Sequence, residues 1–327
     1  DYVRLMLTGE YVSDLSDASG TLWLDVQRRD WSDELLALTG LTRWQMPRLV
    51  EGSQVSGRLR AEVAQSLGLR PGTVVAGGAG DNAASAVGMG AVQPGQGFLS
   101  LGTSGVLFVV TPSYQPNATS ATHAFCHAVP GRWHQMSVML AAASALQWVA
   151  DLLGAADAGA VAARAAALDA GSREAAPIFL PYLSGERTPH NDARVRGSFH
   201  GLDFDTNAAR LGYAVMEGVS FGLLDGLAAL NAAGSEVARL SLVGGGARSA
   251  FWAQMLASTL DLEIVTHGGS AVGGALGAAR LGALSAGAPM DSTCLPPPID
   301  TVYQPDPGER ALLAPRHALF RSLYRRP

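Results

Sequence analysis

The chain has 327 residues, of which 48% are hydrophobic and 16% charged, and its formal net charge is −5. This composition excludes a disordered chain, and the absence of a dense basic block argues against a nucleic-acid surface. All 23 basic residues are arginine, because the sequence contains no lysine. A Walker A lysine, a protein-kinase strand lysine and a Schiff base to pyridoxal phosphate are therefore excluded.

Length and cysteine usage narrow the class of protein further. The length predicts two domains. Cys126 and Cys294 form neither a disulfide framework nor a zinc-binding spacing, which is typical of reduced, apolar residues in a cytoplasmic protein. No apolar run is expected to reach membrane-spanning length, and the first residues lack the design of a signal peptide. We therefore expect no membrane partner.

The first part of the chain contains loops, short helices and one strand. Residues 14–21 predict a polar loop with turn chemistry, and Ser32 predicts the N-cap of a short helix that opens at residues 30–34. Residues 73–76 predict a buried strand. A glycine-rich turn at residues 77–80 follows this strand and leads into a helix.

Asp81 stands at the start of that helix, directly after the glycine-rich turn. Glycine lets another molecule approach the backbone closely, and the positive end of a helix dipole favours an ionised carboxylate. A carboxylate held ionised beside a ligand cleft is what a general base requires. The residue types alone are equally compatible with Asp81 only capping the helix.

The middle of the chain opens with a predicted hairpin. Residues 97–101 and 105–110 are strand-like, and the tight loop at residues 102–105 carries hydroxyls and backbone amides that suit an anion, although many ordinary hairpins look the same. Residues 138 to about 168 predict an alanine-rich helix, and residues 178–182 predict a buried strand. The expected core side of this helix comprises Leu146, Trp148, Val149, Leu152 and Leu153.

A dense polar loop follows at residues 185–192. His190 is a candidate to contact a cleft from this loop. An ion pair of Arg187 with Glu186 or Asp192 that stabilises the loop is an equally good interpretation of the same residues.

The rest of the chain continues to alternate helices and strands. We expect a long amphipathic helix, followed by a strand that runs into the glycine turn at residues 244–249. In this turn, Arg248 is expected either to stack near a nucleotide base or to pair with an acidic neighbour. The spacing does not match the G-x-G-x-x-G of dinucleotide folds. The predicted elements are a helix at 206–230, a strand at 239–243, a helix at 251–260, a strand at 262–266, a glycine-rich loop and helix to about 284, a proline-rich connector at 289–307 and a helix at 309–324.

This alternation predicts an α/β protein. Its three glycine turns, at residues 77–82, 102–105 and 244–249, are candidates to converge on one cleft. Periodicity does not decide whether they meet.

Six segments together give the sequence a specific resemblance. In their order and spacing they resemble the xylulokinases of the FGGY carbohydrate kinase family, along essentially the whole chain. The segments are residues 7–10 (LTGE), 16–21 (SDASGT), 80–84 (GDNAA), 98–105 (FLSLGTSG), 180–190 (LPYLSGERTPH) and 244–249 (GGGARS).

The resemblance implies an actin-like ATPase (ribonuclease-H-like) fold with two domains around a cleft, the N-terminal domain being incomplete. It implies a remainder of the sugar-binding domain at residues 1–90 and a nucleotide-binding domain at 91–285. A proline-rich connector and a C-terminal helix would occupy residues 286–327.

The resemblance also implies transfer of the ATP γ-phosphate to the 5-hydroxyl of D-xylulose, with Asp81 as catalytic base and Asn82 beside it on the sugar. Ala143 stands where glycerol kinases have a glycine near the nucleotide. The residues that would bind ATP are Gly102, Thr103, Ser104, Gln147, Gly244, Gly245 and Ser249.

The family's phosphate-contacting D-x-G-T/S segment and a sugar-contacting Met-His-type segment have no counterpart in these 327 residues. We therefore expect the Mg²⁺ ligands to lie mainly in a missing N-terminal segment, no metal ligands in this chain, and no ATP turnover by it alone. The family resemblance suggests a homodimer. The alternatives are a kinase for ribulose, gluconate or glycerol, or a truncated, non-catalytic nucleotide-binding fragment; residues 184–190 favour xylulose.

Overall fold

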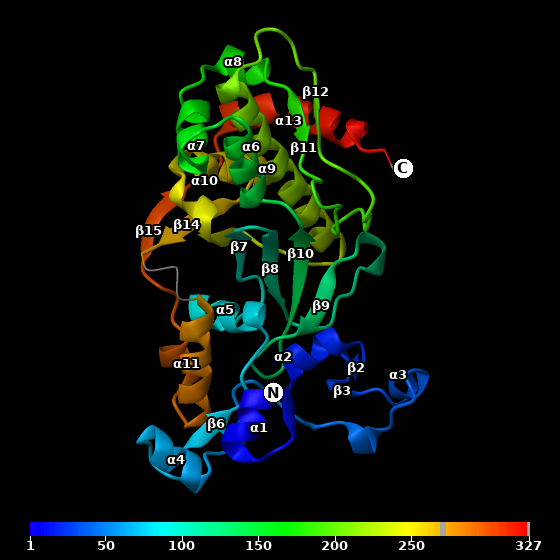
Figure 1. Cartoon of the computed structure of the whole chain (residues 1–327), viewed down its shortest axis with the longest axis vertical. Coiled ribbons are helices and arrows are strands. Elements are labelled where there is room, and N and C mark those ends of the chain that lie inside the picture. The colour runs from blue at the N-terminus through cyan, green and yellow to red at the C-terminus, as the bar shows by residue number, and fades with distance from the viewer. Residues whose placement is uncertain (269–272, 326–327) are drawn as a thin grey trace.

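The computed structural model describes residues 1–268 and 273–325. Its central feature is a seven-stranded mixed sheet in the order β15-β14-β13-β7-β8-β10-β9 (Figure 1). Strand β13 is parallel to both β7 and β14, whereas the other pairings are antiparallel. These strands are β7 (Gly97–Leu101), β8 (Gly105–Thr111), β9 (His123–Cys126), β10 (Trp133–Met139), β13 (Arg239–Val243), β14 (Glu263–His267) and β15 (Ile299–Tyr303).

Both faces of the central strands β7 and β8 are buried, which explains why these strands are almost continuously apolar. Leu107 and Val109 of β8 belong to the largest core cluster, together with residues of the helices on one face. Phe108 and Val110 point the opposite way and pack with Ala86 on the other face. Because successive side chains of β8 point to opposite faces of the sheet, this one strand contributes to two separate hydrophobic cores.

The helices of the first face surround a long central helix, α9 (Ala208–Ala232) (Figure 1). By length and composition α9 is able to cross a membrane, with a mean hydropathy of 1.3 in its best window. However, 89% of that window is buried inside the protein, as in the core helix of a globular domain. The surrounding helices are α6 (Ala143–Leu152), α7 (Ala158–Ala166), α8 (Ala170–Glu174), α10 (Ala250–Leu260) and α13 (Pro307–Leu323).

The C-terminal helix α13 is fixed to α9 by buried charge. Glu217 is completely buried in α9, and its two carboxylate oxygens accept hydrogen bonds from Arg316 at 2.5 and 2.7 Å. Burial raises the pKa of Glu217, and the bonds from Arg316 oppose that rise. A two-stranded ribbon, β11 (Ile178–Leu180) with β12 (Ser198–His200), completes this part of the molecule.

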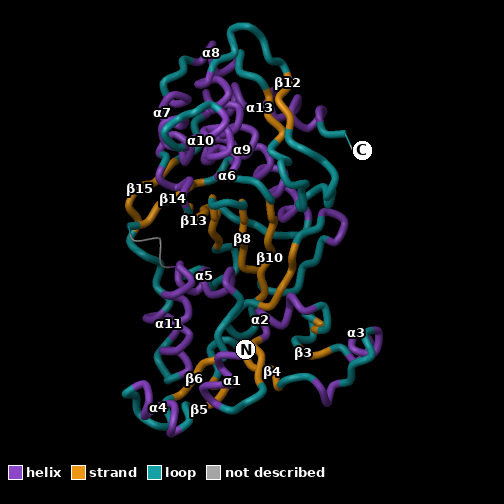
Figure 2. Tube along the Cα trace, viewed as in Figure 1, coloured by secondary structure: helices purple, strands orange, loops and turns teal. Residues whose placement is uncertain are grey.

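The N-terminal residues form the lower part of the molecule in Figure 2, where short strands and helices are joined by long loops. The helices are α1 (Tyr2–Thr8), α2 (Leu15–Ala18), α3 (Asp33–Leu38), α4 (Ala61–Leu67) and α5 (Asp81–Met89), with short 3-10 helices at Ser19–Thr21 and Arg43–Gln45. A further 3-10 helix, Ala118–Ser120, follows β8 in the chain and precedes β9. The strands are β1 (Val12–Asp14), β2 (Leu24–Asp25), β3 (Asp30–Trp31), β4 (Arg48–Val50), β5 (Val55–Arg58) and β6 (Val74–Ala76).

Helix α11 (Gly273–Ser285) returns from the C-terminal half and packs directly against α5 (Figure 1). The two backbones touch, because a methyl group built on Gly277 would lie 1.7 Å from the Ala84 carbonyl oxygen. A methyl group on Gly88 would lie 1.9 Å from the Gly273 carbonyl oxygen. Side chains at these positions would separate the helices. Of the predicted glycine-rich loop before α11, residues 269–272 lie outside the described residues.

Several predicted elements need correction. Residues 133–139 form the strand β10, so the helix predicted from residue 138 begins only at Ala143. That helix also breaks at Gly154, which has a φ of 61°, and continues as α7. Trp148 is 37% exposed and Leu152 68% exposed, so neither belongs to the core.

Two further segments are more regular than predicted. Residues 14–21 contain α2 and a 3-10 turn rather than only a loop. The proline-rich connector contains α12 (Met290–Thr293) and the sheet strand β15.

Candidate active site

The turn before Asp81 requires glycine. A methyl group on Gly77 would lie 2.4 Å from the Glu51 carbonyl oxygen, and Gly78 has a φ of 83°, in the left-handed region. The backbone then enters α5 at Asp81. The sequence therefore folds into a tight strand-turn-helix unit that presents Asp81 at a fixed position.

Three hydrogen bonds from consecutive parts of this turn hold it in place. The amides of Gly77 and Gly78 donate to the carbonyls of Gln54 at 2.8 Å and Gly52 at 3.1 Å. The amide of Gly80 donates to the Ser16 hydroxyl oxygen at 3.1 Å. The side chain of Arg4 also donates to the Gly77 carbonyl. The turn is thus anchored on the loop at residues 52–54 and on the helices α1 and α2.

Asp81 occupies the first helical position, and Gly80 is the N-cap residue. Its carboxylate is exposed rather than buried in the apolar core. One oxygen, Oδ1, accepts from the backbone and side-chain nitrogens of Asn82 at 2.8 and 3.1 Å. The predicted pair of Asp81 and Asn82 therefore lies together at the surface of the first turn.

A second predicted turn joins β7 to β8 and is tied to the start of α6. The first amides of α6 donate into it, Ala142 to the Thr103 carbonyl at 2.9 Å and Ala143 to the Gly102 carbonyl at 2.8 Å. Thr103 is exposed and Ser104 partly exposed, so their polar groups reach the surface. The turn at residues 102–104 and the N-terminus of α6 thus form one structural element, called the polar unit below.

The third predicted turn packs against this unit. Gly244 has a φ of 92°, and a methyl group there would lie 2.8 Å from the Leu101 carbonyl oxygen. A methyl group on Gly246 would lie 2.4 Å from the side chain of Leu101. Ser249 caps α10 by accepting a hydrogen bond from Trp252 at 3.2 Å. Two of the three predicted turns therefore meet at the end of β7.

A cavity of about 550 Å³ opens beside these two turns, between α6, α7 and the start of α10. Gln147, Gly245 and Ser249, all predicted to bind the nucleotide, line it together with Arg248. Ala143 belongs both to this lining and to the polar unit at Thr103. The sequence analysis did not predict that α7 lines the cavity. The signal in the sequence is a helical face of small residues, comprising Ala158, Gly159, Ala162, Ala163 and Ala166.

Asp81 does not line this cavity. Its helix covers the opposite face of the sheet, where Ala86 packs with Phe98 and Phe108. The middle of α5 lies beside the start of α11, because a methyl group on Gly274 would be 3.5 Å from the Ser85 hydroxyl. The turns at residues 102–105 and 244–249 therefore lie together. The approach of Asp81 to a bound nucleotide stays a prediction.

The polar loop at residues 185–192 forms neither of the ion pairs considered for Arg187. The guanidinium of Arg187 contacts the imidazole of His123 at 2.7 Å, rather than forming the expected ion pair. His190 stacks on Tyr324 at 3.7 Å and lines a separate cavity of about 330 Å³. Glu186 is buried, and its carboxylate accepts bonds from the amides of Arg187 at 2.7 Å and Leu140 at 3.1 Å. Burial raises the pKa of Glu186 to about 7.

No three His, Cys, Asp or Glu side chains gather into a metal site within residues 1–268 and 273–325. His127 and His134 are buried, and burial lowers the pKa of both imidazoles. Burial lowers the pKa of His127 to about 4, and its ring nitrogens contact the Ala91 carbonyl and the Val129 amide.

Comparison with known proteins places this geometry in a family. The family model for the C-terminal domain of the FGGY family of carbohydrate kinases matches residues 97–286, and that for the N-terminal domain matches residues 1–88. A xylulose kinase from Klebsiella pneumoniae is 49% identical over 327 residues, which cover 99% of this chain and 67% of that protein.

Solved structures agree with this assignment. The crystal structure of a xyloylose kinase from Brucella ovis has a TM-score of 0.95 and 49% identity, covering 99% of this chain and 66% of that one. A gluconate kinase from Lactobacillus acidophilus has a TM-score of 0.90 and 28% identity, covering 98% and 65%. The chain spans about two thirds of the length of these relatives. It belongs to the FGGY family of carbohydrate kinases and has their actin-like ATPase fold.

Proposed function

We propose that the chain is part of an ATP-dependent kinase that phosphorylates D-xylulose on its 5-hydroxyl. The observation that carries the proposal is an exposed carboxylate, Asp81, on a glycine turn held by hydrogen bonds at three residues. The names of the relatives support xylulose as the sugar. Catalysis by a sugar kinase is mainly a matter of positioning and charge stabilisation, which suits such a rigid turn.

The nucleotide is proposed to occupy the 550 Å³ cavity with its base and the polar unit at Gly102–Ser104 with its phosphates. The volume falls in the range of small-molecule sites, and the small residues of α7 leave room for a flat ring. Arg248 lines the same cavity and is available to stack on the base. Hydroxyls and amides of Thr103 and Ser104 would hold phosphate oxygens in place of the absent lysine.

On the sugar side, Asp81 accepts the proton of the attacking hydroxyl, and Asn82 binds the sugar beside it. The new bond forms between the hydroxyl oxygen and the γ-phosphorus as the bond from that phosphorus to the bridging oxygen breaks, and ADP leaves. A general base at such a step accelerates the reaction about 10²–10⁴-fold.

The family implies a divalent ion, and Mg²⁺ is the ion we expect. Among the residues that the structure describes, no three suitable ligands lie together. Bound to the phosphates, such an ion neutralises their charge.

Other substrates remain alternatives. The similarity to a gluconate kinase keeps gluconate as the second candidate. Ribulose and glycerol, and a fragment that binds nucleotide without catalysis, also remain, since the nucleotide residues do not discriminate among them. A cytoplasmic location and a homodimer stay predictions.

The test is an ADP-release assay on the full-length polypeptide with D-xylulose, D-ribulose, gluconate and glycerol. We expect D-xylulose to give the highest kcat/KM. Asp81→Asn should lower kcat by at least about 100-fold while nucleotide binding is kept. Asp291→Asn, the same change in the first turn of α12, is the matched control. Near-normal turnover by Asp81→Asn would reject the role of this residue, and a preference for another sugar would replace the substrate.

A further inference from the structure

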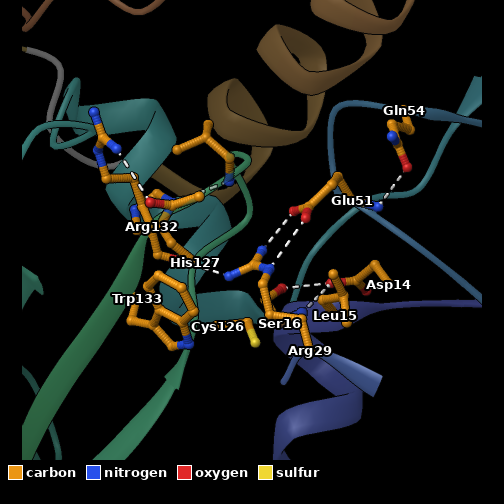
Figure 3. A network of polar contacts seen from close by, with 12 residues as sticks. Asp14, Leu15, Ser16, Arg29, Glu51, Gln54, Cys126, His127, Arg132 and Trp133 are labelled. Atoms are coloured by element: carbon orange, nitrogen blue, oxygen red, sulfur yellow. Dashed lines mark hydrogen bonds and ion pairs between the residues drawn. The ribbon is translucent and has the colours of Figure 1, made fainter. Parts of the chain in front are cut away.

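The junction of β1 and α2, which holds the Asp81 turn, contains two buried polar side chains, Asp14 and Ser16, which are 3% and 5% exposed. The Ser16 hydroxyl donates to Asp14 Oδ2, and Figure 3 shows the two side chains facing each other. The same carboxylate oxygen accepts from the amides of Ser16 at 2.9 Å and Asp17 at 3.1 Å. Asp14 therefore caps α2 and fixes the Ser16 side chain at once.

The direction of these bonds has a consequence for Gly80. A serine hydroxyl has one hydrogen, and here it points to Asp14. The lone pairs of the Ser16 oxygen are therefore presented to the Gly80 amide, which donates to it at 3.1 Å. A contact across 64 residues of sequence thus reaches the residue directly before Asp81.

Other contacts of the turn lie farther from Asp81. Gly77 and Gly78 are held through backbone carbonyls of Gln54 and Gly52. The carboxylate of Glu51 in the same segment is paired with Arg29 at 2.6 Å. Figure 3 shows this pair beside Asp14 and Ser16. These bonds fix the start of the turn, whereas Ser16 fixes its last residue.

We propose that Ser16, oriented by Asp14, is a positioning residue that sets the place of the Asp81 carboxylate for phosphoryl transfer. This inference rests on the proposed function. Without the Ser16 hydroxyl, the Gly80 amide loses its acceptor and the N-terminus of α5 gains freedom to shift. Small displacements of a reacting group are costly, because a misplacement of about 1 Å lowers rates about 100-fold.

A purely structural role for Ser16 needs a matched control, and Ser19 provides one. Its hydroxyl is also buried, donates to the Leu15 carbonyl at 2.7 Å and accepts from the Cys126 amide at 3.0 Å. Ser19 belongs to the same short stretch but contacts strand β9 instead of the Asp81 turn. Loss of this hydroxyl affects stability without touching Gly80.

The experiment compares Ser16→Ala with Ser19→Ala in the full-length polypeptide, measuring kcat, both KM values, the ATP dissociation constant and the melting temperature. We expect Ser16→Ala to lower kcat, calculated per nucleotide-binding site, about 10- to 100-fold. The dissociation constant for ATP should change less than about twofold. Ser19→Ala should keep kcat within about twofold of wild type, with a similar change in melting temperature.

Equal kcat values for the two variants, in an active wild-type protein, would overturn the role of Ser16 alone. A wild-type protein that forms no ADP in response to any of the four substrates would overturn the proposed function, and the role of Ser16 with it. If Ser16→Ala does not fold, Ser16→Cys is measured in its place and read in the same way, because a thiol is of similar size but a weak acceptor.

Discussion

Substitution of Glu186 by glutamine should remove a pH dependence of stability. The carboxyl is 3% exposed, and burial raises its pKa from 4.5 to about 7. The folded protein thus binds this proton more tightly than the unfolded chain. The stabilisation is fully present below pH 4.5 and is lost as the pH rises to about 7.

The size of the effect follows from the shift. At about 1.36 kcal/mol for each pKa unit, the rise from 4.5 to about 7 corresponds to about 3 kcal/mol. Part of it is already lost at pH 5, so we expect the wild-type free energy of unfolding, relative to that of Glu186→Gln, to fall by about 2–3 kcal/mol between pH 5 and pH 8. The glutamine oxygen can still accept bonds from the amides of Leu140 and Arg187.

The assay is urea denaturation of both proteins at pH 5, 6, 7 and 8. Other groups titrate in both proteins, so the difference isolates Glu186. Glu62→Gln, at an exposed position of α4, is the control and should show no such trend. A constant difference between wild type and Glu186→Gln across this range would refute the reasoning.

Three further predictions concern packing, the cavity and buried charge. Gly277→Ala should destabilise the protein by at least about 2 kcal/mol in denaturation experiments, because its methyl group would meet α5, whereas Gly282→Ala, with nothing nearby, should be neutral or slightly stabilising. Ala163→Phe should weaken ATP binding at least about tenfold in calorimetry by filling the cavity, and Ala167→Phe, outside the lining, should not. Arg316→Met should cost about 3–5 kcal/mol of unfolding free energy by leaving the buried carboxylate of α9 unpaired.

The sequence predicted the elements that have strong local signals. Glycine turns followed by helices were found at residues 77–81 and 244–250, and the hairpin at residues 97–111 was found, because local backbone chemistry decides them. Helix α9 was found from its apolar periodicity. The fold and family came from the resemblance of separate motifs rather than from these patterns.

Other features depend on contacts that no local pattern carries. Strand β10 lies between β8 and β9 and is buried over most of its length without a regular alternation, and its last two residues were assigned to the following helix. Strand β15 pairs with β14 at the edge of the sheet. It lies within a proline-rich segment whose composition is typical of a linker. Ser16 looked like part of a turn, since its contact with Gly80 exists only in three dimensions.

The contact between α5 and α11 has a mechanical consequence. Because carbonyl groups of one helix press on glycines of the other, the pair has no side-chain layer that could slide or compress. The two helices therefore move as one rigid unit. Any bending between the N-terminal part and the C-terminal part of the molecule has to occur in the strands and loops that lead into α5 and α11.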